Sequence, residues 1–385
     1  IVQPTGVQTA VIPLLLRREN VVLAASTGSG KTLTFSLPVI QQLKQQELDG
    51  YQRLPSRPRC LILVPTRDLA KQVLSCVKKL SHHIKLSSGS LLGGEDAGPQ
   101  KRMLQGQVDL LVASPGRLLQ HKDQGHVFLG HVTHVIIDEV DTMLTQGFGS
   151  DIRAILQSVV LHPNKTEAAD RRLTAYTPSS HHDSDGPKPI DSERIVEVDG
   201  FHKALPNVKH TMVDLKGKDK LAVLGDVLHS RRGQHARTMV FCNTIDSCRA
   251  LAYHLEMSSS SDIRRDLFAS YHGDLKSDER ERNLEDFRDG HCQYLICTDI
   301  AARGLDIPDV DHVVMFDFPL NPIDYLHRSG RTGRAGREGF VTALVSKRDY
   351  VLSSAIESAI SRKMPLDSLS SSKRDYLSTG KLASV

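Results

Sequence analysis

The sequence lacks several features that would place it in other classes of protein. Its six cysteines are scattered without Cys-x-x-Cys spacing, and no histidine pair stands near them at metal-ligand spacing. Neither a disulfide framework nor a structural zinc site is therefore expected, and the cysteines are typical of a reduced, intracellular protein. No apolar stretch is long enough to span a membrane.

An excess of charge of one sign is also missing. The 385 residues include 49 Lys and Arg against 45 Asp and Glu, which gives a formal net charge of +4. The chain as a whole is no polycation, so a nucleic-acid site must be local and built by loops that face one cleft. The length suffices for two ordinary domains, each able to bury its own core.

Short apolar segments alternate with helical patterns along the chain. This alternation predicts an α/β fold of two domains, each a parallel sheet flanked by helices. The segments predicted as buried strands are residues 21–24, 60–64, 110–112, 134–137 and 313–316.

The alternation restarts near residues 207–211, which places the linker at about 198–206. We expect a first domain over residues 1–200 and a second over 207–365. Residues 352–360 are apolar enough for a closing helix, and a flexible tail is expected over 366–385, where Ser-rich residues 368–372 begin it.

The first predicted strand leads into a glycine-rich loop that ends in Lys-Thr. The loop is a P-loop with Ala in place of the first Gly, and it consists of Ala25, Ser26, Thr27, Gly28, Ser29, Gly30, Lys31 and Thr32. Its backbone N–H groups can surround phosphate oxygens, Lys31 adds a charge for the β and γ phosphates, and the Thr32 hydroxyl can ligate Mg²⁺. The alternative is an ordinary Gly/Ser turn, but Gly-Lys-Thr at a strand-to-helix junction favours the phosphate site.

An acidic tetrad, Asp-Glu-Val-Asp, follows the predicted strand 134–137. Ligands of open parallel sheets bind at the carboxyl ends of the strands. Asp138 is therefore the expected magnesium ligand, and Glu139 is expected to orient or deprotonate an attacking water. Such a cluster can also be a solvated helix N-terminus, but the P-loop upstream favours the catalytic interpretation.

Arginines and glycines alternate in the string that runs from His327 to Arg334. A solvated basic helix is the alternative interpretation, but the glycines argue against it because they weaken a surface helix. Fixed cations placed this far from a nucleotide site in sequence are typical of arginine fingers.

These residues resemble the DEAD-box ATP-dependent RNA helicases of helicase superfamily 2, in the family's order and over nearly the whole chain. The resemblance implies two tandem RecA-like domains and an RNA-dependent ATPase that uses ATP and Mg²⁺. It implies separation of short RNA duplexes or remodelling of RNA–protein complexes. The expected partners are RNA, bound through its backbone regardless of sequence, and protein activators or ribonucleoprotein complexes; we expect a monomer.

The resemblance also assigns roles to single residues. Gln8, in a string similar to the Q motif, is expected to read the adenine edge, because its amide donates and accepts together. Asp306 is expected near the ribose, Arg331 and Arg334 in the finger positions, and His327 between the nucleotide and RNA sites. RNA contacts are expected from Pro65, Thr66, Arg67, Gly93, Gly94, Ser114, Pro115, Gly116, Arg117, Arg280, Thr298 and Arg303, whose composition suits sugar and phosphate.

Three positions depart from the family pattern. Val140 replaces Ala in the acidic tetrad, and Ser277 stands where the family has Gln. No Ser-Ala-Thr string of motif III is present, and the nearest candidate begins at Thr174, in Thr174-Ala175-Tyr176. Either the domain has lost an element or the stretch is mis-assembled, so the coupling of ATP hydrolysis to strand separation is the function most affected.

Two other functions follow from the same residues. An ATP-gated RNA clamp that unwinds weakly would agree with the degenerate motif III. A DNA translocase or nuclease is disfavoured by the Q motif and by the lack of a nuclease-type carboxylate set.

The sequence is less informative about where the protein works. The chain begins at Ile1 without Met and lacks the aromatic residue expected upstream of a Q motif, so we expect an N-terminal truncation. Nucleus or nucleolus, cytoplasm, chloroplast and mitochondrion all stay open.

Overall fold

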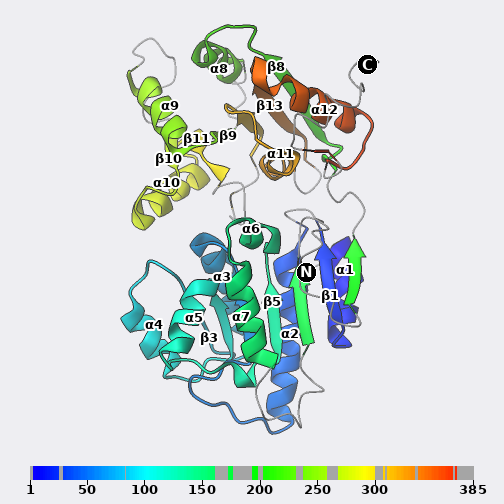
Figure 1. Ribbon diagram of the computed structural model, residues 1–385, viewed down its shortest axis with the longest axis vertical. Helices are drawn as coiled ribbons and strands as arrows, with labels where there is room; N and C mark the ends of the chain where they lie inside the picture. Colours follow the sequence, from blue (N-terminus) through cyan, green and yellow to red (C-terminus); the bar gives the residue numbers. More distant parts are fainter. Residues whose placement is uncertain are drawn as a thin grey trace. The chain divides into compact units, whose positions relative to one another are not determined.

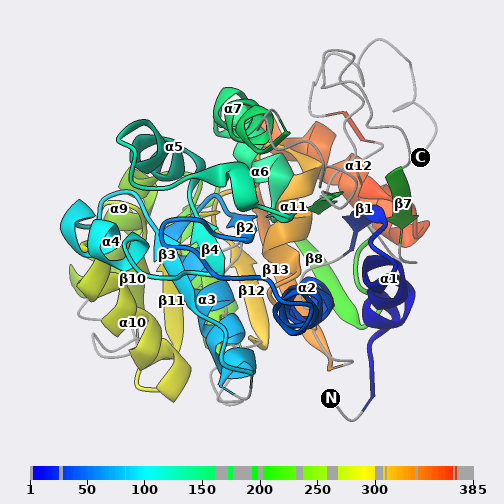
Figure 2. The same cartoon turned by 90° about the horizontal axis from the view of Figure 1, so that it is seen from below.

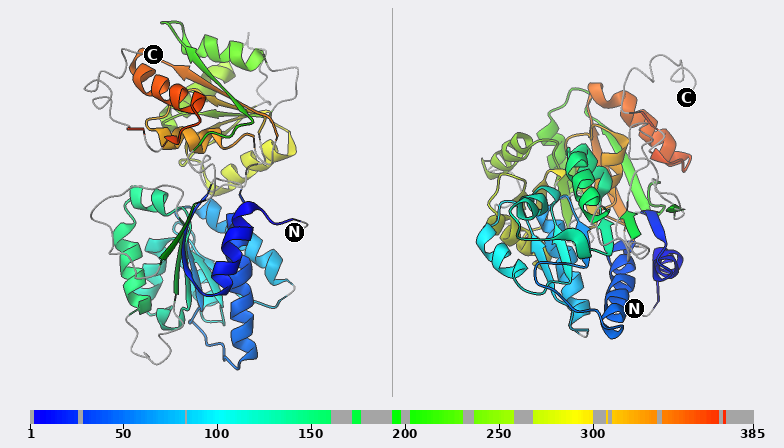
Figure 3. Two further views of the ribbon diagram at one scale, coloured as in Figure 1. Left: turned by 90° about the vertical axis from the view of Figure 1, so that its right-hand side faces the viewer. Right: turned by 60° about the horizontal axis from the view of Figure 1, so that its bottom comes forward.

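The chain divides into two compact units, Ile1–Phe201 and His202–Val385, and each is considered separately. The computed structural model describes residues 3–25, 29–82, 84–160, 172–176, 193–197, 203–230, 237–257, 268–299, 307, 310–333, 337–366 and 369–370. In each unit a parallel sheet carries helices on both faces (Figures 1 and 3). The predicted α/β fold of two parallel-sheet domains is confirmed.

The first unit contains a sheet whose described strands follow the order β3-β4-β2-β5-β6-β1-β7, with parallel neighbours throughout. The strands are β1 (Asn20–Ala24), β2 (Cys60–Leu63), β3 (Ser88–Leu91), β4 (Leu110–Ala113), β5 (His134–Ile137), β6 (Arg172–Tyr176) and β7 (Glu193–Glu197). The helices are α1 (Gly6–Leu16), α2 (Lys31–Leu48), α3 (Arg67–Ser81), α4 (Ala97–Leu104), α5 (Pro115–Asp123), the short 3₁₀ helix η1 (Leu129–His131), α6 (Val140–Thr145) and α7 (Gly149–Val160).

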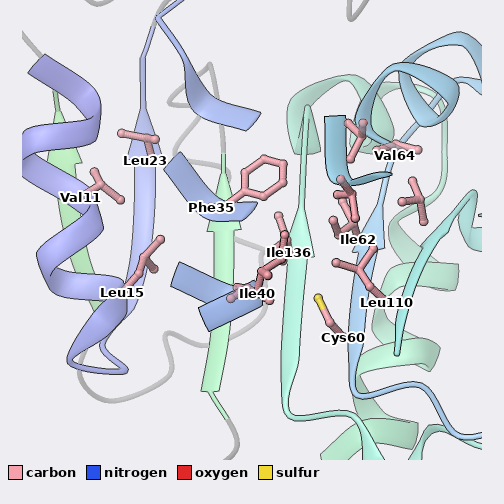
Figure 4. Packing of buried hydrophobic residues seen from close by; sticks show 14 of the residues in the cluster. Val11, Leu15, Leu23, Phe35, Ile40, Cys60, Ile62, Val64, Leu110 and Ile136 are labelled. Atoms are coloured by element: carbon pink, nitrogen blue, oxygen red, sulfur yellow. The ribbon is translucent and has the colours of Figure 1, made fainter. Parts of the chain in front are cut away.

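Both faces of this sheet are buried, which explains why its central strands are continuous apolar runs rather than alternating ones. Ile62 and Ile136 pack with α1, α2 and α3 on one face, as Figure 4 shows. Their neighbours Leu63 and Ile137 pack with α5 and α7 on the other, because successive side chains of a strand point to opposite faces. Figure 2 shows α1 lying along β1 and α2, in agreement with their extensive contacts.

The second unit contains a parallel sheet of order β10-β11-β9-β12-β13-β8. Its strands are β8 (Val208–Asp214), β9 (Thr238–Phe241), β10 (Phe268–Tyr271), β11 (Tyr294–Cys297), β12 (His312–Met315) and β13 (Gly339–Val345). Its helices are α8 (Lys220–His229), α9 (Ile245–Met257), α10 (Ser277–Asp289), α11 (Pro322–Ser329), the 3₁₀ helix η7 (Lys347–Asp349) and α12 (Tyr350–Ser361).

The strands predicted from apolar runs correspond to β1, β2, β4, β5 and β12, and the predicted closing helix is α12. The division between the two units falls inside residues 198–206, where the linker was expected. Residues 371–385 of the predicted tail lie outside the described residues. No described helix is both long and apolar enough to cross a bilayer.

Candidate nucleotide and nucleic-acid sites

The P-loop connects β1 to α2, and its last glycine is required by geometry. Gly30 is the N-cap of α2 and has a left-handed backbone with φ 90°. A Cβ added there would lie 2.7 Å from Nε2 of Gln8, so only glycine fits. The α2 N-terminus faces this loop and favours an anion. Ser26, Thr27 and Gly28 lie outside the described residues.

Lys31 begins α2, and its ammonium reaches back into the loop. Nζ of Lys31 donates a hydrogen bond to the Ala25 carbonyl oxygen at 2.7 Å. The side chain thus spans the loop in which a phosphate is expected, and a phosphate oxygen would compete with that carbonyl for the ammonium. Thr32 follows on the same helical turn.

The Q-motif residues dock on the P-loop through Thr5. Thr5 and Gln8 form a capping box at the start of α1. The backbone N–H of Gln8 donates to Oγ1 of Thr5 at 3.3 Å, and the backbone N–H of Thr5 donates to the side-chain Oε1 of Gln8 at 3.1 Å. The Thr5 hydroxyl also donates to the Ser29 carbonyl at 2.8 Å. Thr5 is therefore a site residue that the sequence analysis did not assign, although Thr-x-x-Gln is a sequence signal for such a cap.

The acidic tetrad lies at the carboxyl end of β5. Asp138 is buried, and its Oδ1 accepts the Glu139 backbone N–H at 3.1 Å. Burial raises the pKa of the Asp138 carboxyl above its ordinary value, and the nearby Lys31 ammonium opposes that rise. Glu139 has a left-handed backbone (φ 52°, ψ 47°), an uncommon conformation for a non-glycine residue that often accompanies function.

The motif III candidate lies between the two strands that lead to the nucleotide residues. In β6, Thr174 is in register with Ile136 of β5, and Ala175 is in register with Val22 of β1. The strand that would carry motif III, β6, is therefore present between β5 and β1. Residues 177–192 and the side chains of β6 lie outside the described part, so the coupling role of Thr174 stays a prediction.

Three of the expected RNA segments meet at the carboxyl ends of β2, β3 and β4. Thr66 caps α3 by accepting the Leu69 N–H at 3.3 Å. The next residue, Arg67, packs against Gly94, whose left-handed backbone (φ 73°) and lack of a Cβ make room for the guanidinium. The Gly93 N–H approaches the Ser114 hydroxyl at 3.4 Å. Pro65 precedes Thr66, and Pro115 and Gly116 begin α5.

Arg117 has a different environment from the one its assignment suggests. Its Nε donates to the Leu92 carbonyl at 3.1 Å and its Nη2 to the Glu95 carbonyl at 2.6 Å. These bonds clamp the turn that contains Gly93 and Gly94. The guanidinium thus shapes the backbone of a predicted RNA segment, and direct phosphate contact by Arg117 stays a prediction.

Arg328 organises the corresponding edge of the second unit. It is 1% exposed, and its guanidinium donates to both carboxylate oxygens of Asp299 at 2.6 and 2.8 Å. It also donates to Oδ1 of Asn243 at 2.7 Å and to the Asp317 carbonyl at 2.8 Å. Arg328 thereby joins Asn243, Asp299 and Asp317, which follow three different strands of the sheet. The sequence analysis gave Arg328 no role of its own.

Asp317 continues this network. Its carboxylate accepts the Asn243 N–H at 3.0 Å, the Ser247 hydroxyl at 2.6 Å and the Lys220 ammonium. Burial alone would raise the pKa of Asp317, but these bonds, with Lys220 foremost, hold it below its ordinary value. The carboxylate is therefore charged at neutral pH.

The remaining predicted residues of the second unit are placed only in part. Thr298 directly follows β11, and its N–H donates to the Tyr271 carbonyl at 3.3 Å. Nη1 of Arg280 donates to the Gly273 carbonyl at 3.2 Å. His327 lies on α11 and Arg331 two residues beyond its end. Arg303, Asp306 and Arg334 lie outside the described residues.

Comparison with known proteins gives matches in both units of the chain. The DEAD/DEAH box helicase model matches residues 5–177, and the helicase conserved C-terminal domain model matches residues 219–336. The chain is 40% identical over 374 residues to DEAD-box ATP-dependent RNA helicase 39 of Arabidopsis thaliana, which covers 95% of this chain and 59% of the relative. It is 34% identical over 346 residues to nucleolar RNA helicase 2 of Rattus norvegicus, over 89% of this chain and 43% of the relative.

A solved structure gives the same result. S. cerevisiae Dbp5 bound to RNA and ADP BeF3 is similar with a TM-score of 0.75 and 26% identity, over 93% of this chain and 88% of that one. The chain belongs to the DEAD-box helicase family. It spans less than two thirds of the length of the curated relatives named above.

Proposed function

We propose that this chain is an RNA-dependent ATPase that separates short RNA duplexes or remodels RNA–protein complexes. The observation that carries the proposal is the docking of the Q-motif helix on the P-loop, through Thr5 and Ser29, in the same sheet as the strand that leads to Asp138. The residues proposed to read adenine, hold phosphate and catalyse hydrolysis therefore lie at one edge of one sheet. Membership of the family and the RNA-bound Dbp5 relative support RNA as the second ligand.

Each predicted nucleotide residue of the two units has a proposed role. Gln8 reads adenine, the P-loop amides and Lys31 hold the phosphates, and Glu139 orients or deprotonates the attacking water. Asp306 contacts the ribose. Arg331 and Arg334 stabilise charge that develops on the transferred phosphoryl group.

Mg²⁺ is part of the proposal. The Asp138 carboxylate and Thr32 hydroxyl are hard oxygen donors, and Mg²⁺ characteristically takes one or two protein oxygens together with phosphates and waters. The Lys31 charge beside Asp138 favours the ionised carboxylate that a metal requires. The ion would neutralise charge on the β and γ phosphates.

The proposed RNA contacts are sequence-independent. Thr66, Arg67, Gly93, Gly94 and Ser114 offer hydroxyls, backbone N–H groups and a guanidinium, which suit phosphate and sugar rather than base edges. The proposed set is completed by Pro65, Pro115, Gly116, Arg280, Thr298, Arg303 and the linking residue His327, and Arg117 supports it by shaping the turn at Gly93 and Gly94. A helicase is favoured over the ATP-gated clamp by the RNA helicase relatives. Compartment, protein activators and a monomeric state stay predictions.

The test compares ATP hydrolysis with RNA, with DNA and with neither, beside a duplex-unwinding assay. We expect stimulation by RNA alone. Glu139→Gln, which removes charge without changing shape, should keep ATP and RNA binding and lower turnover by about a thousandfold or more. Equal stimulation by DNA, or wild-type turnover in the variant, would contradict the proposal.

A further inference from the structure

Three elements that carry nucleotide residues are joined a second time, through the side chain of Gln42. Gln42 lies on α2, the P-loop helix, and is buried. Its Nε2 donates to the Leu15 carbonyl in the last turn of α1 at 2.6 Å, and the same nitrogen lies 3.5 Å from the Leu16 carbonyl. Its Oε1 lies 2.6 Å from Nε2 of His134, the first residue of β5.

The direction of these bonds is fixed by chemistry. A carbonyl oxygen can only accept, so the Gln42 amide nitrogen must face Leu15 and its oxygen must face His134. Nε2 of His134 is then the donor, and Nδ1 of the same ring lies 2.9 Å from the Thr133 hydroxyl. One side chain therefore bonds to a carbonyl in the last turn of α1, which also accepts the Arg18 backbone N–H at 2.9 Å, and to the start of the strand that leads to Asp138.

The contact at Leu15 bears on Gln8 because both lie on one helix. α1 has 11 residues, and Leu15 is about 10 Å from Gln8 along its axis. The rest of the α1 contact is apolar, made by Val11 and Leu15 among others (Figure 4). Apolar packing has little directionality, so hydrogen bonds are what fix the position of α1 along α2.

The opposite end of α1 tolerates little displacement. Nε2 of Gln8 lies so close to Gly30 that a Cβ there would be 2.7 Å away, and Thr5 is bonded to Ser29 at 2.8 Å. A shift of α1 by a few tenths of an ångström would change how the Gln8 amide faces the P-loop. Base recognition is sensitive to shifts of this size because two hydrogen bonds must be aligned at once.

We propose that Gln42 is a positioning residue for base selection, which holds α1 on α2 and β5 so that the Gln8 amide discriminates adenine from other bases. The proposal rests on the proposed base-reading role of Gln8. Gln42 itself does not touch the nucleotide; it acts through α1. Nucleoside triphosphates that make no use of the Gln8 amide are held by the P-loop alone and do not depend on Gln42.

The experiment measures the affinities of ATP, GTP and UTP for Gln42→Leu, a change that keeps the size of the side chain and removes both hydrogen bonds. We expect ATP binding to weaken about tenfold, equivalent to about 1.4 kcal/mol, while GTP and UTP affinities stay within about twofold. Gln41→Leu is the matched control, because Gln41 is the exposed neighbour on the same helix. It should leave all three affinities unchanged.

A second variant tests the proposal in case Gln42→Leu does not fold. His134→Leu keeps the Gln42–Leu15 bond and removes the donor from β5, together with the contact of the His134 ring to its neighbour Thr133, so ATP affinity should fall about threefold with the same base dependence. Equal weakening of all three nucleotides in either variant would make the residue merely structural and overturn the proposal. An unchanged ATP preference in Gln42→Leu would also overturn it.

If Gln8 does not read the base, the experiment gives a different result from the one expected if only the positioning role of Gln42 is wrong. Gln8→Ala should abolish the preference for ATP over GTP. If it does so while Gln42→Leu does not, only the positioning role is wrong. If Gln8→Ala keeps the preference, the base-reading role of Gln8 is wrong, and the role of Gln42 is overturned with it.

Discussion

Deeply buried arginines, Arg59 in the first domain and Arg328 in the second, lie at opposite edges of the two sheets. Arg59 precedes β2 and stands at the amino edge of the first sheet, whereas Arg328 contacts residues that follow β9, β11 and β12 at the carboxyl edge of the second. Both are 1% exposed. Because ligands bind at the carboxyl edge of such sheets, the same chemistry serves stability in one domain and the proposed active site in the other.

The partners of Arg59 are all structural. Its Nη2 donates to Glu47 and to Asp109, each at 2.7 Å, and its Nη1 donates to the Leu43 carbonyl at 2.8 Å. The guanidinium also lies 5.0 Å from the centre of the Tyr51 ring. These bonds tie the end of α2 to loops far from any residue assigned to ATP or RNA.

The largest effect is expected from Arg328→Lys. An ammonium cannot reproduce the two-pronged bond to Asp299 together with the bonds to Asn243 and the Asp317 carbonyl. RNA-stimulated turnover should fall by about a thousandfold, measured at saturating ATP and RNA. Arg249→Lys is the control, because Arg249 pairs with Asp274 at the surface. Wild-type turnover in Arg328→Lys would remove the contrast between the two arginines.

Arg59→Lys should act on stability instead. Removing hydrogen bonds from a buried ion pair costs about 3 kcal/mol, so the unfolding transition of the first domain should move to lower denaturant concentration. Turnover per folded molecule should stay within about twofold of wild type, because no partner of Arg59 belongs to the nucleotide edge. A loss of turnover without a loss of stability would contradict this division of roles.

Acid should weaken the second domain through His210. Nδ1 of His210 lies 2.8 Å from the Tyr325 hydroxyl on α11, the helix of Arg328, and burial lowers the pKa of His210 to about 4. Unfolded histidine binds a proton near pH 6.5. The stabilisation is therefore complete above about pH 6.5 and declines as the pH falls toward 4, by about 3 kcal/mol in total.

His210→Gln tests this assignment. Glutamine can still accept a hydrogen bond from Tyr325 and does not titrate, so the slope of stability against pH between 6.5 and 4 should decrease by nearly one proton. Chemical unfolding of the second domain at several pH values measures the slope. An unaltered slope would mean that another group titrates there.

The smallest expected effect belongs to Arg117, which lies at a carboxyl edge like Arg328 but bonds to backbone carbonyls. Arg117→Ala should weaken binding of unrelated RNA sequences about fivefold, through loss of the turn at Gly93 and Gly94. The slope of affinity against salt should change by well under one unit, since a lost phosphate contact removes roughly one unit. A change of one full unit in this slope would show that Arg117 contacts an RNA phosphate directly.

Local patterns predicted the strands and the order of the motifs, because an apolar run or a Gly-Lys-Thr string is contained in a few neighbouring residues. They could not predict the roles of Arg328 and Gln42. Arg328 meets Asn243 across 85 residues of sequence, and Gln42 meets His134 across 92, and no periodicity links such pairs. The role of Thr5 could have been predicted from the sequence, since a capping box is a local signal. Resemblance to the family suggested RNA contact for Arg117, whose bonds to Leu92 and Glu95 depend on how two loops meet.

The left-handed backbone of Glu139 has a consequence for engineering. Glycine adopts that conformation without the roughly 1 kcal/mol that another residue loses there, so Glu139→Gly should be among the substitutions that a selection for heat resistance enriches. The same substitution deletes the carboxylate proposed to handle the attacking water. Libraries of this chain that are screened for thermal tolerance alone should therefore enrich variants that no longer hydrolyse ATP. The substitution responsible would be at Glu139, where the native chain is less stable than it could be.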